Sequence, residues 1–141
     1  MIPRYRAWDK IHKTMYEVDD IMSIDFGKSE ISVKTLFFER TNCYNFNDIV
    51  LMQSTGLRDK NDREIFEGDV VTDGHTAGDI KNHPTLGFYM VDDNGTERWF
   101  SDNATIEDFE EDVETAHKIL EIIGNIWEDG ELLDVENTEE N

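Results

Sequence analysis

The chain has little of several residue types, and each shortage narrows what the protein can be. Its 141 residues include one cysteine and two prolines, and 13 lysines and arginines stand against 33 aspartates and glutamates. The single cysteine, Cys43, excludes an intrachain disulfide, and we expect it to be a buried thiol in a reducing compartment. No apolar run approaches the ~18 residues that a membrane-spanning helix needs. We therefore expect a protein that does not enter the membrane.

The shortage of cations gives a formal net charge of −20. Nonspecific binding to nucleic acid comes from lysines and arginines that release counterions from the phosphates, and a field of this sign repels a polyanion. Direct nucleic-acid binding is therefore not expected. We interpret the basic and aromatic side chains that neighbour one another on predicted strands as partners within the fold. These are Arg4, Arg6, Trp8, Arg98 and Trp99.

Large apolar side chains are nevertheless well represented, with 38% hydrophobic and 11% aromatic residues. Disordered chains are poor in such residues, so the composition predicts a folded body. The length fits one domain, which we place at residues 1–130. Residues 131–141 form an acidic tail that we expect to be disordered.

Alternating apolar and polar residues predict short strands, and turn signals separate them. Asn94-Gly95 suits the type I′ turn of a two-residue hairpin. Thr105 is a candidate N-cap for a short helix from Ile106 towards Ala116, and residues 40–48 and 74–86 have the composition of loops. The expected strands cover residues 3–9, 14–18, 21–26, 30–39, 49–53, 69–73, 87–93, 96–101 and 118–128, although a helix continuing through Leu120 competes for the start of the last one.

The predicted fold is therefore mainly β: a small antiparallel body, built as an SH3-like, partly open barrel with one short helix. The strand pattern is organised around residues 49–73, where Gly56 and the Glu67-Gly68-Asp69 bend allow the chain to turn sharply. The sequence contains no internal repeat.

The same central stretch resembles the YopX family of phage and prophage proteins, through Leu51-Met52-Gln53, Thr55-Gly56-Leu57, Asp59-Lys60-Asn61 and the segment EIFEGDVV at residues 64–71. Arg6-Ala7-Trp8-Asp9 with Met15-Tyr16 resembles that family's N-terminal hairpin. The segment IGNIWE at residues 123–128, followed by Leu132-Leu133, resembles its C-terminal signature. One departure is Asp62, where the family usually has glycine.

The resemblance implies a small β-rich protein encoded by bacteriophages or integrated prophages, with no established activity and no catalytic residues. The N-terminal segment MIPRYRAWDK lacks the pattern of a signal peptide, so we expect the protein in the cytoplasm, which the resemblance makes that of the bacterial host. We therefore expect an accessory protein that acts as a non-enzymatic interaction module on an unknown host or phage protein. Self-association is left open.

The candidate contact surface is the loop after the central strand, because loops on a tight scaffold often carry binding residues. Asp and Asn side chains there bond to nearby backbone groups and stabilise turns. The loop residues are Arg58, Asp59, Lys60, Asn61, Asp62 and Arg63.

A second hypothesis is an acidic mimic that imitates the phosphates of nucleic acid and blocks a host or phage protein that binds DNA or RNA. The simpler interpretation is that the charge only keeps the protein soluble and its strand edges unpaired. The residues that would form the acidic face are Glu107, Asp108, Glu110, Glu111, Asp112 and Glu114.

Catalysis and metal binding are weaker hypotheses, and we assign no catalytic residue, cofactor or metal. A small hydrolase would need paired carboxylates with separated pKa values, which the loop region could supply. His75 and His83 with Asp73 and Asp79 fit no familiar metal spacing. The carboxylates considered for hydrolysis are Asp59, Asp62, Glu64, Glu67 and Asp69.

Overall fold

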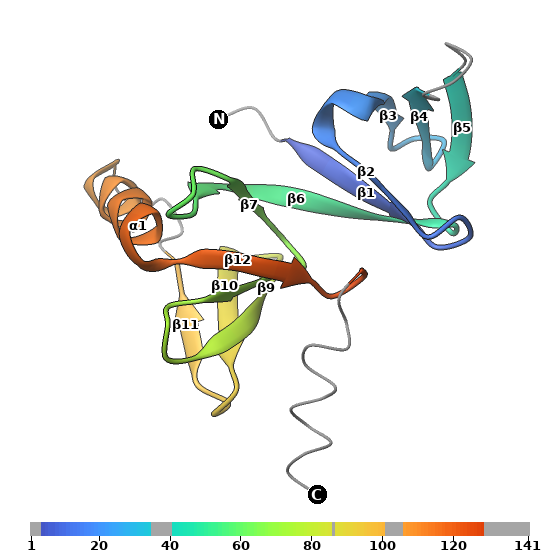
Figure 1. Ribbon diagram of the computed structural model, residues 1–141. Coiled ribbons are helices and arrows are strands. Elements are labelled where there is room, and N and C mark those ends of the chain that lie inside the picture. The colour runs from blue at the N-terminus through green and yellow to red at the C-terminus, as the bar shows by residue number, and fades with distance from the viewer. Residues whose placement is uncertain (1–3, 35–40, 86, 101–105, 129–141) are drawn as a thin grey trace, which may run out of the picture. The chain divides into compact units, whose positions relative to one another are not determined.

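The computed structural model describes residues 4–34, 41–85, 87–100 and 106–128, and side chains within the helix from Asp112 onwards. The fold is mainly β, with antiparallel sheets, one of which curls into a half barrel, and with one α-helix in the described part of the chain. This confirms the predicted fold class (Figure 1). The elements are β1 Tyr5–Asp9, β2 Thr14–Tyr16, a 3₁₀ turn Val18–Asp20, β3 Ile21–Asp25, β4 Glu30–Lys34, β5 Thr41–Asn45, β6 Ile49–Arg58, β7 Glu64–Phe66, β8 Asp69–Thr72, β9 Ala77–His83, β10 Gly87–Asp92, β11 Glu97–Trp99, α1 Ile106–Ile119 and β12 Glu121–Asn125.

The chain divides into two compact units, which we call the N-terminal unit (Met1–Gln53) and the C-terminal unit (Ser54–Asn141). The division falls within β6, so the first part of this strand belongs to one unit and its end to the other. The single domain over residues 1–130 stays a prediction. The predicted disordered tail, residues 131–141, lies outside the described residues.

In the N-terminal unit, β1 pairs with both β2 and the first part of β6, and all pairs are antiparallel. A separate sheet has the order β3-β4-β5. Ala7, Ile31, Val33 and Ile49 form the buried core, as the alternation along each strand requires. Tyr44 and Phe46 pack against this core along with four further half-buried side chains.

In the C-terminal unit, a five-stranded antiparallel sheet has the order β11-β10-β9-β8-β12. The predicted helix extends to Ile119, three residues beyond the predicted end. Val113 and Ala116, two of its predicted apolar positions, pack with the core of this sheet. The buried core residues are Leu57, Ile65, Val71, Ile80, Met90, Ala116, Leu120 and Ile122.

Two strands lie where the sequence predicted loops. β5 has the polar sequence TNCYN, which lacks an apolar alternation, and its side chains are mostly exposed. The expectation of a buried thiol is therefore wrong: Cys43 is exposed, with its Sγ 3.3 Å from the Oγ of Ser32. β9 was missed because Gly78 and polar residues interrupt its pattern.

The β10–β11 hairpin forms as expected, but its turn differs from the predicted two-residue type. The Gly95 N–H donates to the carbonyl of Asp92 at 2.9 Å, so the turn centres on residues 93 and 94, and Gly95 follows with φ of +82°. The Asp92 carboxylate accepts the N–H groups of Asn94 and Thr96, each at 2.9 Å. This side chain favours the longer loop, in which glycine takes the left-handed position.

In the part of the chain that the structure describes, no helix is both long and apolar enough to cross a membrane.

Candidate interaction loop

The predicted contact loop, residues 58–63, connects β6 with β7 and is organised by one buried carboxylate. Asp59 is 0% exposed. Its Oδ1 accepts the N–H groups of Asn61 at 3.0 Å and Arg63 at 2.9 Å. Its Oδ2 accepts the N–H of Ile122 in β12 at 2.9 Å. The side chain thus fixes the loop conformation and ties the loop to a strand 63 residues away.

These contacts keep Asp59 ionised. Burial alone would raise the pKa of its carboxyl group, but the N–H donors of Ile122, Arg63 and Asn61 and the charge of Arg63 together hold the pKa below its ordinary value of 3.8. An ionised carboxylate can only accept hydrogen bonds, so it matches the backbone donors that surround it. The arrangement is that of a structural anchor.

The loop is also joined to the end of α1 and the start of β12. The backbone N–H of Lys60 donates to the carbonyl of Leu120 at 2.8 Å, and the Nζ of Lys60 lies 3.1 Å from Glu121 Oε2. His117 Nε2 lies 4.0 Å from Asp62 Oδ1, and both side chains are largely exposed. Exposed ion pairs are worth at most ~1 kcal/mol, so the backbone bond and the Asp59 bonds contribute most of the attachment.

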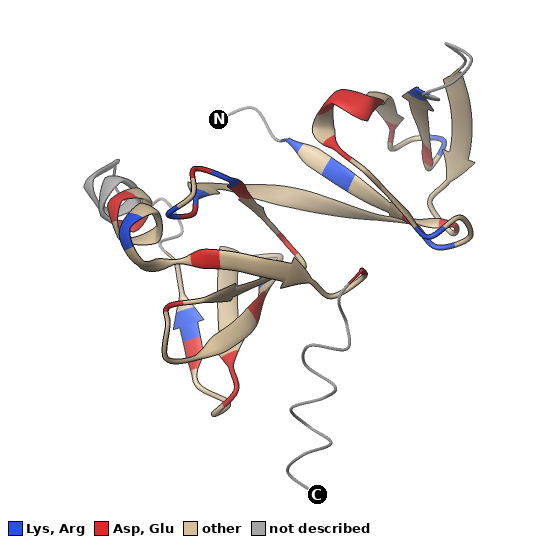
Figure 2. Ribbon diagram, in the orientation of Figure 1, with Lys and Arg blue, Asp and Glu red and all other residues tan. Residues whose placement is uncertain are grey.

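Five of the six predicted loop residues present their side chains to solvent, all except Asp59. Arg58 Nη1 donates to the Asp62 carbonyl at 2.9 Å, and Asp62 takes a left-handed backbone conformation with φ of +64°. Aspartate tolerates this conformation better than most residues do, although less freely than glycine. The turn therefore carries cations and an anion side by side (Figure 2).

The other carboxylates considered for hydrolysis are not equivalent to one another. Asp69 is 2% exposed, and its Oδ2 accepts the N–H of Phe66 at 2.8 Å. Glu64 and Glu67 are half-buried, whereas Asp62 is exposed. Asp59 and Asp69 thus serve as acceptors for backbone donors at the two bends that flank β7.

The carboxylates of the metal hypothesis are also bonded to protein groups. Asp73 accepts the N–H groups of Thr76 and His75 at 2.9 Å each, and these bonds, with the charge of Arg98, lower its pKa to about 2. Asp79 lies 3.0 Å from Lys81 Nζ. Among the side chains that the structure describes, no three potential metal ligands gather.

The predicted acidic face lies on α1, and most of its side chains fall outside the described residues. The helical backbone includes the whole of residues 107–114, but the side chains of Glu107, Asp108, Glu110 and Glu111 lie outside the described residues. Of the two that are described, Asp112 is half-buried, and Glu114 is exposed with its Oε1 2.7 Å from Lys118 Nζ.

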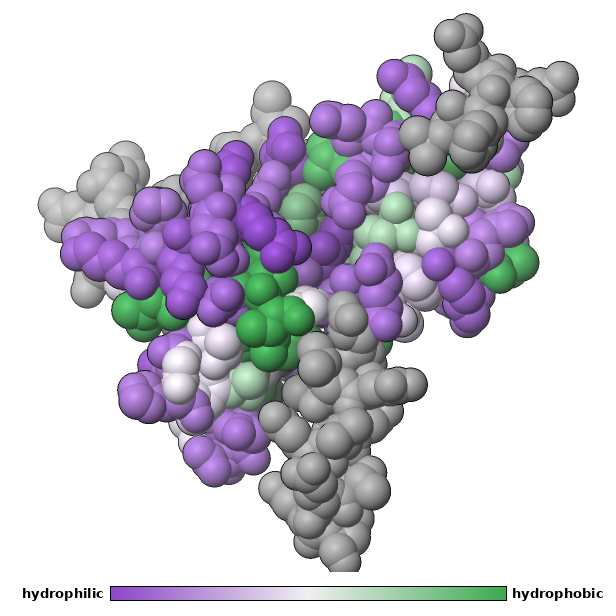
Figure 3. Space-filling model, viewed as in Figure 1, coloured by the Kyte–Doolittle hydropathy of each residue, from purple (hydrophilic) through white to green (hydrophobic). Residues whose placement is uncertain are grey.

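The basic and aromatic side chains fall into two groups. Arg6 and Trp8 are buried, at 7% and 5% exposure, so neither can form an open stacking surface. Trp99 is 40% exposed and stacks on Tyr89 with ring centres 4.4 Å apart, and Arg98 Nη1 lies 3.3 Å from Asp73 Oδ2. Arg98 and Trp99 therefore pair within the fold, as predicted. In Figure 3, hydrophilic residues cover most of the visible face, and hydrophobic ones form small separate areas.

Comparisons with known proteins agree with the resemblance seen in the sequence. The family model described as YopX protein matches residues 4–134. Protein EF1440 from Enterococcus faecalis has a similar structure, with a TM-score of 0.58, 27% identity and coverage of 94% of this chain and 99% of that one. Protein yopX from Bacillus subtilis has a TM-score of 0.54, 16% identity and coverage of 92% and 96%. No curated protein matches the chain.

Proposed function

The chain belongs to the YopX family, and we propose that it is a non-enzymatic protein-interaction module encoded by a bacteriophage or an integrated prophage and used in the bacterial cytoplasm. One observation carries the proposal: the buried Asp59 holds the loop in place while five neighbouring side chains remain exposed. A loop that is ordered before binding loses less conformational entropy when a partner docks.

The chemistry of the exposed loop residues favours a protein as the partner. Arg58, Lys60 and Arg63 supply cations, and Asn61 and Asp62 add polar groups of other kinds. Such a mixed surface gives specificity through matched charges and hydrogen bonds. A partner whose surface carries charges of only one sign would be repelled by some of these groups.

The experiment is an affinity capture from infected and uninfected host lysates with matched charge variants. Arg58→Glu with Lys60→Glu changes the loop but keeps Asp59. Lys28→Glu with Lys34→Glu makes the same change in net charge at two exposed lysines of the N-terminal unit. We expect the loop variant to bind the partner at least about tenfold more weakly and to lose it from the capture, while the control variant retains it.

Equal thermal unfolding midpoints for the two variants show that the comparison concerns binding and not folding. Equal loss of the partner by both variants would refute the loop as the contact and would indicate a nonspecific charge effect. Retention by both would place the contact elsewhere.

The acidic mimic remains the second candidate, because a net charge of −20 suits a partner that binds nucleic acid. Replacing Glu107, Glu110 and Glu111 with glutamine tests it. A mimic predicts loss of a nucleic-acid-binding partner from this variant and retention by the loop variant, which is the reverse of the outcome that the interaction loop predicts.

A further inference from the structure

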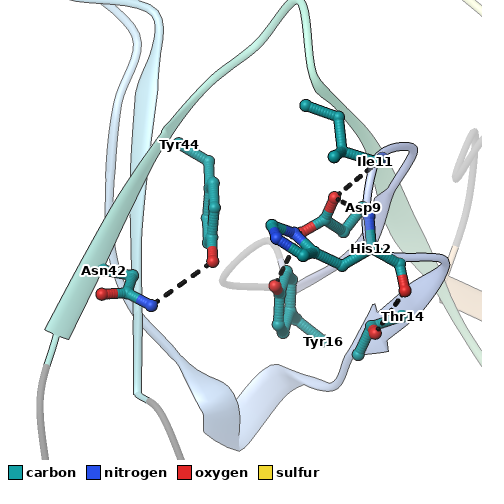
Figure 4. A network of polar contacts seen from close by, with 7 residues as sticks. All are labelled: Asp9, Ile11, His12, Thr14, Tyr16, Asn42 and Tyr44. Atoms are coloured by element: carbon teal, nitrogen blue, oxygen red, sulfur yellow. Dashed lines mark hydrogen bonds and ion pairs between the residues drawn. The ribbon is translucent and has the colours of Figure 1, made fainter.

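A second buried aspartate organises the turn between β1 and β2. Asp9 is 0% exposed, and its Oδ1 accepts the N–H groups of Ile11 at 3.0 Å and His12 at 2.9 Å. Its Oδ2 accepts a hydrogen bond from the hydroxyl group of Tyr16 at 2.7 Å and lies at the same distance from the Nδ1 of His12 (Figure 4). Four donors thus surround one carboxylate and fix the backbone of the turn.

The aromatic residues around this carboxylate hold its donors in place. Burial alone would raise the pKa of Asp9, but the bonds from His12, Tyr16 and Ile11 keep the pKa below its ordinary value, so the carboxylate accepts and His12 Nδ1 donates. Tyr44 stacks on the ring of Tyr16 at 5.8 Å and meets the His12 ring edge-on at the same distance. His12 is therefore oriented although its side chain is 57% exposed.

The fixed turn presents four consecutive exposed residues, Lys10, Ile11, His12 and Lys13. Ile11 is 63% exposed, more than any other large hydrophobic residue of the described part of the chain. Lys10 Nζ donates to the carbonyl of Asn47 at 3.0 Å. Neither lysine forms an ion pair with a carboxylate of the described residues, whereas Lys60, Lys81, Arg98 and Lys118 do.

We propose that residues 10–13 form a second contact surface, which binds an acidic protein segment that carries one apolar side chain. Lys10 and Lys13 pair with its carboxylates, and Ile11 packs against its apolar residue. The charge of the turn is complementary to such a segment and opposite to that of the chain as a whole, which directs the partner to this turn. Burial of the exposed Ile11 side chain supplies the apolar part of the affinity.

The apolar residue is the reason to favour an acidic protein over nucleic acid. Phosphate contacts use cations alone, so a nucleic-acid backbone would leave the exposed Ile11 without an apolar partner. The loop at residues 58–63 offers cations without an exposed apolar side chain. The two surfaces therefore differ in chemistry and lie in different units, so either can fail without the other.

The test is an NMR titration of the full-length ¹⁵N-labelled chain with two synthetic peptides. Both consist of glutamate and aspartate with one central residue, which is leucine in the first and alanine in the second. We expect the leucine peptide to shift the amide signals of residues 10–13 first. We expect the alanine peptide to bind there about tenfold more weakly, because its methyl group buries less apolar surface against Ile11 than a leucine side chain does.

Charge variants give the matched control. Lys10→Glu with Lys13→Glu is expected to weaken the leucine peptide about tenfold or more, whereas Lys28→Glu with Lys34→Glu leaves its binding at residues 10–13 unchanged within about twofold. Ile11→Ala is expected to remove the difference in affinity between the leucine and alanine peptides, because it keeps both lysines but lacks the large apolar side chain. All three variants spare Asp9, so the turn keeps its anchor.

Three results would overturn the proposal. Shifts of equal size at Lys28 or at residues 58–63 would indicate general attraction to cations. Equal affinity of the two peptides would remove the role of Ile11. Stronger binding of a single-stranded oligonucleotide to residues 10–13 than of the leucine peptide would assign the turn to nucleic acid.

Discussion

At the scale of single residues, two aspartates have the same structural role. Asp9 ends β1 and Asp59 directly follows β6, each precedes a lysine, and both are 0% exposed. In each, Oδ1 accepts two backbone N–H groups of the turn that follows. The turn composition was visible in the sequence for both. The bond from Ile122 to Asp59 was not, because no local pattern marks a donor 63 residues away. Nor does a local pattern in the sequence mark Tyr16 and Tyr44 as neighbours of Asp9 and His12.

Asp59→Asn tests the anchor directly. The amide offers one acceptor oxygen where the carboxylate offers two, so a backbone donor loses its charged partner. We expect a loss of ~1.5–3 kcal/mol in the free energy of unfolding at neutral pH, measured by urea denaturation. Asp62→Asn, which changes an exposed carboxyl of the same loop, is the control and is expected to stay within ~0.5 kcal/mol of the wild type.

The acid dependence of this difference follows from the lowered pKa of Asp59. Its folded-state pKa lies below the ordinary 3.8, so the carboxylate contributes its full stabilisation above that value and loses it as the pH falls through the folded-state pKa. The gap in unfolding free energy between wild type and Asp59→Asn should therefore narrow below pH 3.8. A gap that stays constant down to pH 2, while both chains remain folded, would contradict the assigned ionisation.

At the scale of elements, β9 shows why some strands could not be predicted. Gly78 interrupts its pattern, yet a Cβ atom at this position would lie 2.2 Å from the carbonyl oxygen of Val91 and 2.8 Å from its carbon. The close approach of β9 and β10 requires glycine, and no signal in the sequence of β9 alone reveals that neighbour. β5 was missed for a different reason, since its polar side chains lie at the surface.

Gly78→Ala is therefore expected to destabilise the C-terminal unit. The obstacle is backbone and cannot rotate away, so we expect a loss of ~1–3 kcal/mol or more, measured by urea denaturation. Gly27→Ala is the comparison, because its added Cβ would meet only the Asp25 carboxylate, at 3.3 Å. An equal effect of the two substitutions would show that the β9–β10 approach is not as tight as described.

At the scale of the whole molecule, the sequence predicted the fold class and the family, because alternation and turn signals are distributed over most of the chain. It predicted the contact loop as a set of adjacent residues, and the structure adds the anchor that makes the set a fixed surface. The division of the chain within β6 had no sequence signal, because this strand is continuous from Ile49 to Arg58.

The salt dependence of binding distinguishes the hypotheses for the whole molecule, since the affinity of an acidic mimic would come mainly from the net charge of −20. A loop-mediated complex is expected to persist when the salt rises from about 0.1 M to about 1 M, because the Debye length falls from about 10 Å to about 3 Å and screens distant charges more than close contacts. Release of the partner over that range favours the mimic. Isothermal titration at the two salt concentrations measures the difference.

The most direct test of the contact loop is amide hydrogen exchange in the free chain and in its complex with the captured partner. The account predicts that the N–H groups of Asn61, Arg63 and Ile122 are already protected in the free chain, because Asp59 accepts all three. It also predicts that added protection on binding falls within residues 58–63. Exchange of these amides at unfolded rates in the free chain, or new protection at residues 107–114 alone, would contradict it.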